Sequence, residues 1–292
     1  MKIQSRCLVC LLDQALRMLE ENKISKRKEK EVLSGVLKLL KSISWSLTPV
    51  EAASLVYKKV AKSINKQDPL LKVKEKNNKQ ALKLYPFLKR ELNKSSDKLL
   101  CALKISGIGN EIDFAKGNYE KIDLKTLKQS LRKKHNSRFF KYNLFKKHLK
   151  NAQEILYLAD NSGEVLFDKV LIEELVKIKK EIVYVVKEGP AGNDALLKDA
   201  IFFKINKIAK VITNGTSFPG TPLKFCSNEF KKYLKKSNFI LSKGQGNFET
   251  LEQEKAPIFF LFKNKCSLVS EKIKVPVGEI VLIPSLQSNF SK

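Results

Sequence analysis

Short apolar segments that each end in a loop rich in glycine, asparagine or aspartate constrain the fold of this chain most strongly. They lie in its second half, and helical patterns follow at least the first three of these loops. The candidate strands are 154–159, 181–187, 209–213, 238–242, 257–262 and 278–283. Strand, loop and helix repeated in this way predict a parallel sheet covered by helices. Ligands of such sheets bind beyond the carboxyl ends of the strands, so we expect these loops to converge on one site.

The first half of the chain shows no such alternation and is predicted to be helical. Leucines recur at helical spacing near its start, and Thr48–Glu51 carries the hydroxyl, the proline and the acid of a helix beginning. Pro86 is expected to break a later helix, because proline lacks the N–H of a helical hydrogen bond. We therefore divide the chain into a helical region with a connecting arm, 1–150, and an α/β domain, 151–292.

The chain is strongly basic, with 57 lysine and arginine residues against 30 acidic residues and a formal net charge of +27. Such a charge suits nucleic acid, an anionic membrane surface or small phosphorylated compounds. Only six of the basic residues are arginine, however, and arginine makes the usual bidentate contacts to phosphate and guanine. We therefore expect no specific nucleic-acid partner and attribute the lysine excess to an AT-biased genome.

The sequence also predicts where the protein works. No apolar run approaches the ~20 residues that span a bilayer, and the start of the chain does not resemble a signal peptide. Five cysteines with a single C-x-x-C pair argue against a secreted disulfide scaffold. A structural zinc at Cys7 and Cys10 would need two more ligands, so we expect small buried residues there. We predict a cytoplasmic protein without a membrane partner, and the sequence does not indicate its oligomeric state.

Acidic and amide side chains follow the first two candidate strands. Asp160 and Asn161 come after the first strand, Glu164 and Asp168 begin the helix beyond them, and Asp194 stands at the head of the next helix. Oxygen donors without histidine or cysteine favour Mg²⁺ or Mn²⁺ over zinc. Each residue taken alone is also explained as a helix cap or a turn residue. Their parallel placement after two neighbouring strands favours a metal site.

The same loops offer groups that could bind phosphate. The backbone amides at Ser162 and Gly163 open a helix, where free N–H groups attract an anion. Lys243 lies on a glycine-rich turn close to Asn247, and its ammonium group would act as a point charge on phosphate. The turn lacks the spacing of a Walker loop, and an ordinary flexible hairpin is the alternative interpretation.

Taken together, these loops resemble the damage-control phosphatase family, a former domain of unknown function, and in particular its compact prokaryotic subfamily. The likeness extends over nearly the whole chain. It rests on Cys7-x-x-Cys10 with Gln14, Asp68-Pro69, Leu84-Tyr85-Pro86, 109–114, 158–164 with Asp168, Gly189-Pro190, Asn193-Asp194-Ala195, Asn214-Gly215, Pro219-Gly220-Thr221 and 242–249.

The resemblance implies a helical N-terminal region followed by an α/β fold, a three-layer sandwich around a mostly parallel, Rossmann-like sheet. It implies a metal-dependent phosphatase that hydrolyses small phosphate monoesters, either sugar phosphates or damaged phosphometabolites, with Mg²⁺, Mn²⁺, Co²⁺ or Ni²⁺. By position, Asp160, Asn161 and Asp194 would bind the metal, and Lys243 would hold the phosphate. Asp160, Glu164 and Asp194 are the candidate catalytic residues.

The resemblance also adds two residues from the helical part and shows one departure. Asn110 and Asp113 would approach the substrate from the helical region. The family usually carries an acid in the third loop, where this chain has Thr216-Ser217. This difference concerns the substrate preference more than the metal site.

Two other classes of protein are compatible with the sequence. One is a methyltransferase that acts on small carboxylates, although no clear glycine-rich cofactor loop follows the first strand. The other is a non-catalytic module that binds phosphate or a nucleotide. The chain lacks G-x-S-x-G, H-E-x-x-H and the dinucleotide motif G-x-G-x-x-G, so acyl transfer, zinc proteolysis and dinucleotide redox chemistry lose support.

Overall fold

A computed structural model of the 292-residue chain describes residues 1–109, 124–133, 136–285 and 287. Helices make up the described part of the first half, as the sequence predicts. They are α1 (Ser5–Glu21), α2 (Lys26–Lys41), α3 (Pro49–Ser63), α4 (Leu71–Asn93), α5 (Lys98–Gly109), α6 (Leu124–Arg132) and α7 (Tyr142–Asn151). The predicted start of α3 is confirmed, because the Thr48 hydroxyl accepts from the Glu51 N–H and the Glu51 carboxylate accepts from the Thr48 N–H.

The second half alternates between strands and helices. The strands are β1 (Glu154–Leu158), β2 (Glu181–Val186), β3 (Lys210–Thr213), β4 (Ile240–Lys243), β5 (Ile258–Lys263) and β6 (Ile280–Pro284). The helices are α8 (Val165–Lys177), α9 (Leu197–Phe202), α10 (Asn228–Lys236), α11 (Gln245–Leu251) and α12 (Ser267–Ile273), with single 3-10 turns at Ile205–Lys207 and Leu223–Phe225. Each strand lies within a residue or two of its predicted range.

The strands form one mixed sheet with the order β3-β2-β1-β4-β5-β6. β1 to β5 are parallel, and β6 pairs antiparallel with β5. The chain adds strands outward in one direction from β1 to β3 and then resumes on the other side of β1 with β4. The carboxyl ends of β1 and β4 therefore flank the topological switch point, which is where ligands of such sheets bind.

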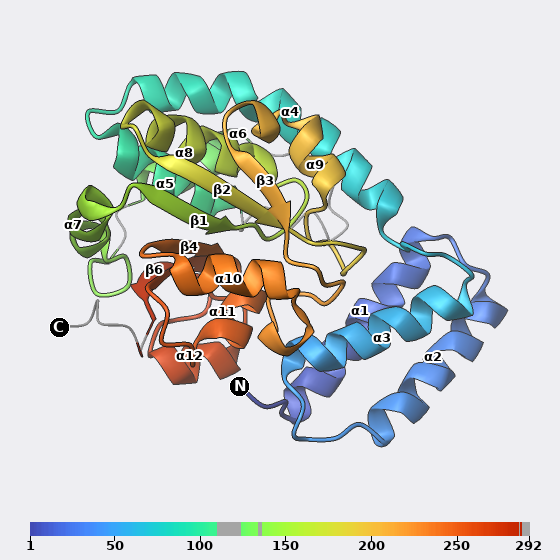
Figure 1. Cartoon of the computed structure of the whole chain (residues 1–292). Helices are drawn as coiled ribbons and strands as arrows, with labels where there is room; N and C mark the ends of the chain where they lie inside the picture. Colours follow the sequence, from blue (N-terminus) through green and yellow to red (C-terminus); the bar gives the residue numbers. More distant parts are fainter. Residues whose placement is uncertain (110–123, 134–135, 286, 288–292) are drawn as a thin grey trace.

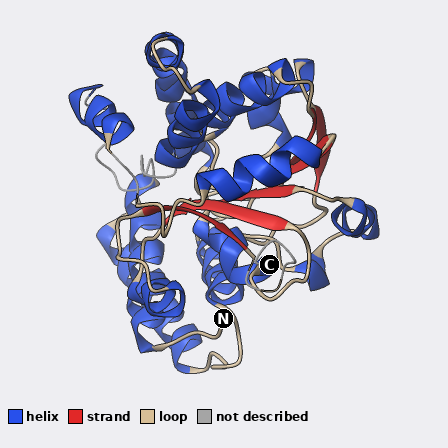
Figure 2. Cartoon of the chain, turned by 90° about the vertical axis from the view of Figure 1, so that its left-hand side faces the viewer, coloured by secondary structure: helices blue, strands red, loops and turns tan. Residues whose placement is uncertain are grey.

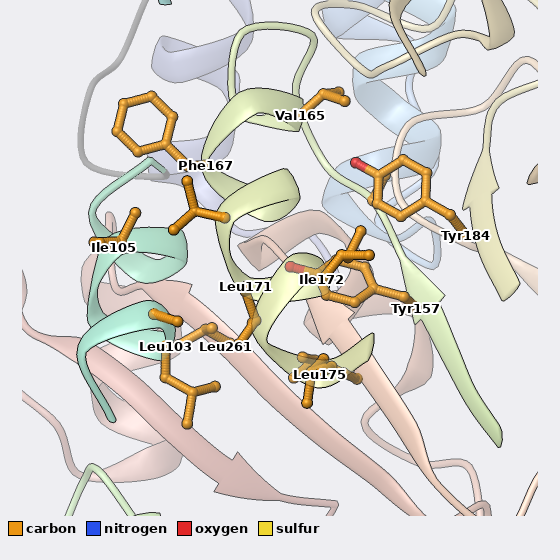
Figure 3. Close-up of a cluster of buried hydrophobic side chains, with 14 of the residues drawn as sticks. Leu103, Ile105, Tyr157, Val165, Phe167, Leu171, Ile172, Leu175, Tyr184 and Leu261 are labelled. Atoms are coloured by element: carbon orange, nitrogen blue, oxygen red, sulfur yellow. The ribbon is translucent and has the colours of Figure 1, made fainter. Parts of the chain in front are cut away.

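Helices cover both faces of this sheet, so the molecule has three layers (Figure 2). On one face, Tyr157 and Tyr184 belong to a core shared with α4, α5, α7 and α8. Figure 3 shows both tyrosine rings on one side of α8, Tyr157 beside Ile172, with Leu103 and Ile105 of α5 on the other side of this helix. On the other face, Leu156 and Phe260 pack with α10, α11 and α12. The predicted three-layer α/β architecture is confirmed.

A third core lies among α1, α2 and α3, which form a separate bundle beside the sandwich. Figure 1 shows the arrowheads of β2 and β3 pointing toward the side on which this bundle lies. The core cluster that covers one face of the sheet also contains residues from the first half of the chain, beginning at Ala81. Much of the predicted helical region thus packs as a layer of the sandwich. The division at residue 150 into two folding units stays a prediction.

The predicted helix break at Pro86 is wrong. α4 runs without interruption from Leu71 to Asn93 and contains Pro86 on its solvent side. The side chains of Leu84, Leu88 and Leu92 are buried on one face of the helix before and after the proline. Continuous packing of this face outweighs one missing hydrogen bond, because the carbonyl group that loses its donor faces the solvent side, where water can bind it.

Candidate active site

The loops after β1 and β2 are joined by backbone hydrogen bonds, and this junction positions the predicted acids. The amide of Ala195 donates to the carbonyl oxygen of Asp160 at 2.7 Å, and the amide of Ser162 donates to the carbonyl oxygen of Asn193 at 3.0 Å. Asn161 and Asp194 therefore pair as an antiparallel bridge. Two acids that are 34 residues apart in the chain become neighbours at the carboxyl edge of the sheet.

Three carboxyl groups gather around this junction. The Asn161 side-chain amide donates to Asp160 Oδ2 at 2.9 Å and to Glu164 Oε1 at 2.6 Å. Burial raises the pKa of Asp160 well above its usual range, and the negative charges of Glu164 and Asp194 raise it further. The predicted acids are therefore brought together, and their mutual repulsion makes the site attractive to a cation.

Asp160 is closely covered by the loop after β4. Gly244 has a φ of +81°, and a Cβ atom on it would lie 2.0 Å from Cγ of Asp160. No side chain fits in that space, so the glycine is required both by its backbone conformation and by the neighbouring carboxylate. This contact brings the glycine-rich turn that carries Lys243 directly onto the acidic site.

Lys243 is fully buried, and its ammonium group contacts carboxylates on α8 and the turn before it. Lys243 Nζ lies 2.7 Å from Asp168 Oδ1 and 3.5 Å from Glu164 Oε2, and it donates to the carbonyl oxygen of Ser106 at 3.0 Å. Burial alone would lower the pKa of Lys243, but the charges of Asp168 and Glu164 outweigh it and keep the pKa above its usual value. The predicted phosphate-binding cation thus stays charged beside the acidic site.

Asp168 holds a hydrogen-bonded network beneath the site. Its Oδ1 atom accepts from the hydroxyl groups of Tyr157 at 2.7 Å and Ser106 at 2.9 Å, and its Oδ2 atom accepts from Tyr184 at 2.9 Å. Burial and the charge of Asp168 raise the pKa of both tyrosines well above the usual value, so both remain donors. The sequence predicts Asp168 only as an acid at the beginning of the helix. No pattern in the sequence indicates Ser106, which is 62 residues from Asp168 in the chain.

Asp194 is stabilised by groups that the sequence did not point to. The amide of Gly220 donates to its Oδ2 atom at 3.2 Å, and Nζ of Lys187 lies 3.5 Å from the same atom. Burial raises the pKa of Asp194, while the positive charges of Lys187 and Lys74 lower it. Lys187 directly follows β2 and is buried. The sequence does not show that a lysine at this position is buried, so its contact with Asp194 could not be predicted.

The other predicted substrate ligands occupy different positions. Asn247 is buried, its amide donates to the carbonyl oxygens of Ala159 at 3.0 Å and Lys243 at 2.7 Å, and its Oδ1 atom accepts from Thr221 at 2.7 Å. It therefore ties the loops after β1, β3 and β4 together. Ser162 and Gly163 lie in the turn that leads into α8. A direct contact of any of these residues with phosphate stays a prediction.

Asn110 and Asp113 lie outside the described residues, so their predicted approach to the site stays an expectation. The expectation that both cysteines of the C-x-x-C pair are buried is wrong. Cys10 is exposed and Cys7 is half-buried, because α1 turns only one side toward the core of the small bundle.

The residues at the site suit a hard divalent cation. Among the described residues, no three His, Cys, Asp or Glu side chains are arranged to hold a metal by themselves. The donors that this junction would offer are the carboxylates of Asp160 and Asp194 with the side chain of Asn161, a mixture that Mg²⁺ and Mn²⁺ accept and zinc sites rarely use. The carboxyl groups are close together and buried, so their mutual repulsion destabilises the metal-free fold. A bound cation would offset this repulsion.

The strand order and the polar groups at the switch point define an α/β protein with an acidic site next to a buried lysine. The sequence profile of the ARMT1-like damage-control phosphatase domain matches residues 3–281. The chain therefore belongs to the damage-control phosphatase family, as the resemblance implied.

Individual relatives agree with this assignment over their whole length. A damage-control phosphatase of Pyrococcus horikoshii is 36% identical over 96% of this chain and 97% of its own length. An uncharacterised protein of Methanocaldococcus jannaschii is 37% identical, with 97% and 95% covered. The crystal structure of a DUF89 family protein from Pyrococcus horikoshii superposes with a TM-score of 0.88 at 35% identity and covers 98% of this chain and 99% of that one. The family and the name of the first of these relatives support a phosphatase that acts on damaged metabolites.

Within the described part of the chain, no helix is both long enough and apolar enough to cross a membrane.

Proposed function

We propose that this protein is a metal-dependent phosphatase that hydrolyses small phosphate monoesters, such as sugar phosphates or damaged phosphometabolites. The observation that carries the proposal is the meeting of Asp160, Glu164 and Asp194 with the buried Lys243 at the switch point of the sheet. Acidic oxygen donors next to one fixed positive charge suit a phosphate group and its cation together.

The cation would be held by Asp160, Asn161 and Asp194. When bound, it would neutralise charge on the phosphoryl oxygens and make a coordinated water molecule more acidic. Lys187 and the Gly220 amide favour the charged form of Asp194, against the effect of burial, and fix its position. Asp168 does the same for Lys243, and a phosphoryl oxygen would take the place of the long 3.5 Å contact between the ammonium group and Glu164.

Glu164 is the residue that we propose as general base. One of its oxygens accepts from Asn161, and the other lies 3.5 Å from Lys243 Nζ, so the carboxylate lies between the proposed metal ligands and the proposed phosphate-binding cation. A carboxylate in that position could accept the proton of an attacking water molecule at Oε2. Direct attack by the Asp160 carboxylate is the alternative route, and solvent ¹⁸O incorporation under single-turnover conditions would separate the two.

The proposal is tested by assaying the purified protein on p-nitrophenyl phosphate with EDTA and then with Mg²⁺, Mn²⁺, Co²⁺ or Ni²⁺. We expect activity that requires a divalent cation and is lost in Asp160→Asn and Asp194→Asn. A protein that binds phosphate but releases none from any ester would instead be a binding module. Methyl transfer to a carboxylate, with no phosphate release, would support the methyltransferase class.

A further inference from the structure

A basic cavity of about 430 Å³ lies between the α1–α3 bundle and the sandwich. Its walls come from the segment that connects α3 to α4, from the first turn of α4, and from the loop and helix that follow β2. Figure 1 shows α4 beginning beside the bundle and then passing along α9, where Asn78 of α4 donates to Asp199 of α9 at 2.6 Å. Three lysines from these separate elements line the cavity, namely Lys66, Lys72 and Lys198.

The charges of these lysines are not neutralised by the protein. Lys66 Nζ donates to Oδ1 of Asn22, an uncharged acceptor, at 2.5 Å. Asn22 in turn donates to the carbonyl oxygen of Pro69 at 2.8 Å, so it holds the Lys66 ammonium group at the cavity without removing its charge. Among the described residues, no carboxylate forms an ion pair with Lys66, Lys72 or Lys198.

Asp68 is the one carboxylate among the described residues that line the cavity, and its charge is already balanced. Its Oδ2 atom lies 2.9 Å from Nζ of Lys74, which is fully buried. Its Oδ1 atom accepts from the Tyr57 hydroxyl group at 2.9 Å and from the Leu70 N–H group at 3.0 Å. Lysines outnumber acids throughout this chain, but here three of them converge on one concave site, with three positive charges left to a ligand.

We propose that this cavity binds a small organic anion that carries several negative charges on an apolar or ring-shaped body. Lysine ammonium groups act as point charges on phosphate or carboxylate groups. The volume lies within the range of pockets that hold small organic ligands, about 300–1,000 Å³, and exceeds what a bare ion needs. The apolar part of the wall, which would receive the body of the ligand, consists of Pro69, Leu71, Pro190 and Leu196.

The cavity is distinct from the candidate active site. Its lining contains none of the proposed metal and phosphate ligands Asp160, Asn161, Asp194 and Lys243. Pro190 and Leu196 belong to the segment that also carries Asp194, so a bound anion would join the α1–α3 bundle to that segment. The inference does not depend on the proposed phosphatase function, because its test needs neither a metal ion nor turnover.

Isothermal titration calorimetry with ATP tests the site, on protein that a chelating resin has freed of metal ions. ATP should bind the wild type, and tripolyphosphate, which has the charges without the ring body, should bind more weakly. The triple variant Lys66→Gln, Lys72→Gln, Lys198→Gln should raise the Kd for ATP about thirtyfold, because each exposed charge contact contributes a factor of about three. All three lysines are exposed, so the variant should fold like the wild type. The inference is overturned by a wild type that does not bind ATP, by equal affinity for tripolyphosphate, or by an unchanged Kd in the triple variant.

Two further variants locate the bound ATP. The matched control is Lys232→Gln, Lys235→Gln, Lys236→Gln, which removes the same number of charges from exposed lysines on α10, on the opposite face of the sheet from α4. At 0.15 M salt the Debye length is about 8 Å, so this control should change the Kd less than about twofold. An increase equal to that of the cavity variant would show only general attraction by the net charge of +27 and would refute the site.

Glu164→Gln removes a carboxylate next to Lys243 without changing the shape of the side chain, and it should leave the Kd for ATP unchanged. ATP bound at the candidate active site would bind this variant more tightly, because a repelling charge has gone. That result, together with an unchanged Kd in the cavity variant, would place ATP at the active site and overturn the inference.

Discussion

Asp160 combines burial with the charges of two other carboxylates, and all three factors raise its pKa above the usual value of 3.8. An acid whose pKa is raised by folding binds more protons in the folded chain than in the unfolded chain. The free energy of unfolding of the metal-free protein therefore decreases as pH rises from about 4 toward the raised pKa. At neutral pH, the side chain that the proposed chemistry needs most is unfavourable to the fold.

The Asp160→Asn substitution separates these two effects, because it keeps the shape and removes the charge. The metal-free variant should melt at a higher temperature than the wild type at pH 8, and the difference should shrink toward pH 4. Phosphatase activity should fall by about two orders of magnitude or more. Mn²⁺ should raise the thermal midpoint of the wild type by mass action and that of the variant much less. Melts with EDTA and with Mn²⁺, together with rates, check this. Full activity in the variant would remove Asp160 from the site.

Gly244 allows the close contact that covers Asp160, and Gly244→Ala should disrupt it. A methyl group would clash with the Asp160 carboxylate, and the residue would keep an unfavourable positive φ. Gly192→Ala is the control, because Gly192 also has a positive φ, of +58°, but a Cβ atom there meets nothing within 4 Å. The control should lose only the backbone term of about 1 kcal/mol. Gly244→Ala should lose clearly more, with most of the activity. Urea denaturation and rates compare them, and equal losses in the two variants would contradict the proposed contact.

At the scale of single elements, the sequence predicts what is locally encoded. The strands were found because apolar runs end at glycine and asparagine, and the start of α3 was found because its cap lies within four residues. Pro86 was misread because the burial of Leu84 and Leu88 on one face depends on partners in α8. Helix propensity assigns the proline an unfavourable free energy, but tertiary packing decides whether the helix continues through it.

α11 provides a titration test at this scale. Burial raises the pKa of Glu249 to about 7, although the hydrogen bond from Gln245 at 2.8 Å works in the opposite direction. The pKa in the unfolded chain is near 4.5, so Glu249 destabilises the folded state progressively as pH rises from about 4.5 to about 7, and the effect is constant at higher pH. Glu249→Gln should therefore be close to neutral at pH 4.5 and stabilising by about 3 kcal/mol at pH 8. Urea denaturation at both pH values measures this. A variant that is destabilised at pH 8 would show that the charged form has a favourable partner.

At the scale of the whole molecule, the site depends on contacts that the sequence could not reveal. Lys243 and Asp168 are 75 residues apart, and Lys243 and Ser106 are 137 apart. The α1–α3 bundle also interacts electrostatically with the site. Burial raises the pKa of Tyr57 on α3, and the charges of Asp68 and of Asp194 at the site raise it further. The chain order of the strands predicted which loops meet. The carboxylates that keep Lys243 charged, Asp168 and Glu164, lie on α8 and just before it, 75 and 79 residues away in the chain.

The net charge of +27 gives a prediction for the molecule as a whole. Folding brings the lysines closer together, and 57 basic residues cannot all find partners among 30 acids. Exposed ion pairs such as Lys28–Glu31 contribute about 0–1 kcal/mol each and weaken in salt, so their loss is small. Screening of the general repulsion should dominate, because the Debye length falls from about 30 Å at 0.01 M to about 8 Å at 0.15 M salt. The urea midpoint should thus rise with NaCl over this range at pH 7, with EDTA present to exclude metal binding. A midpoint that falls would mean that specific ion pairs outweigh the lysine excess.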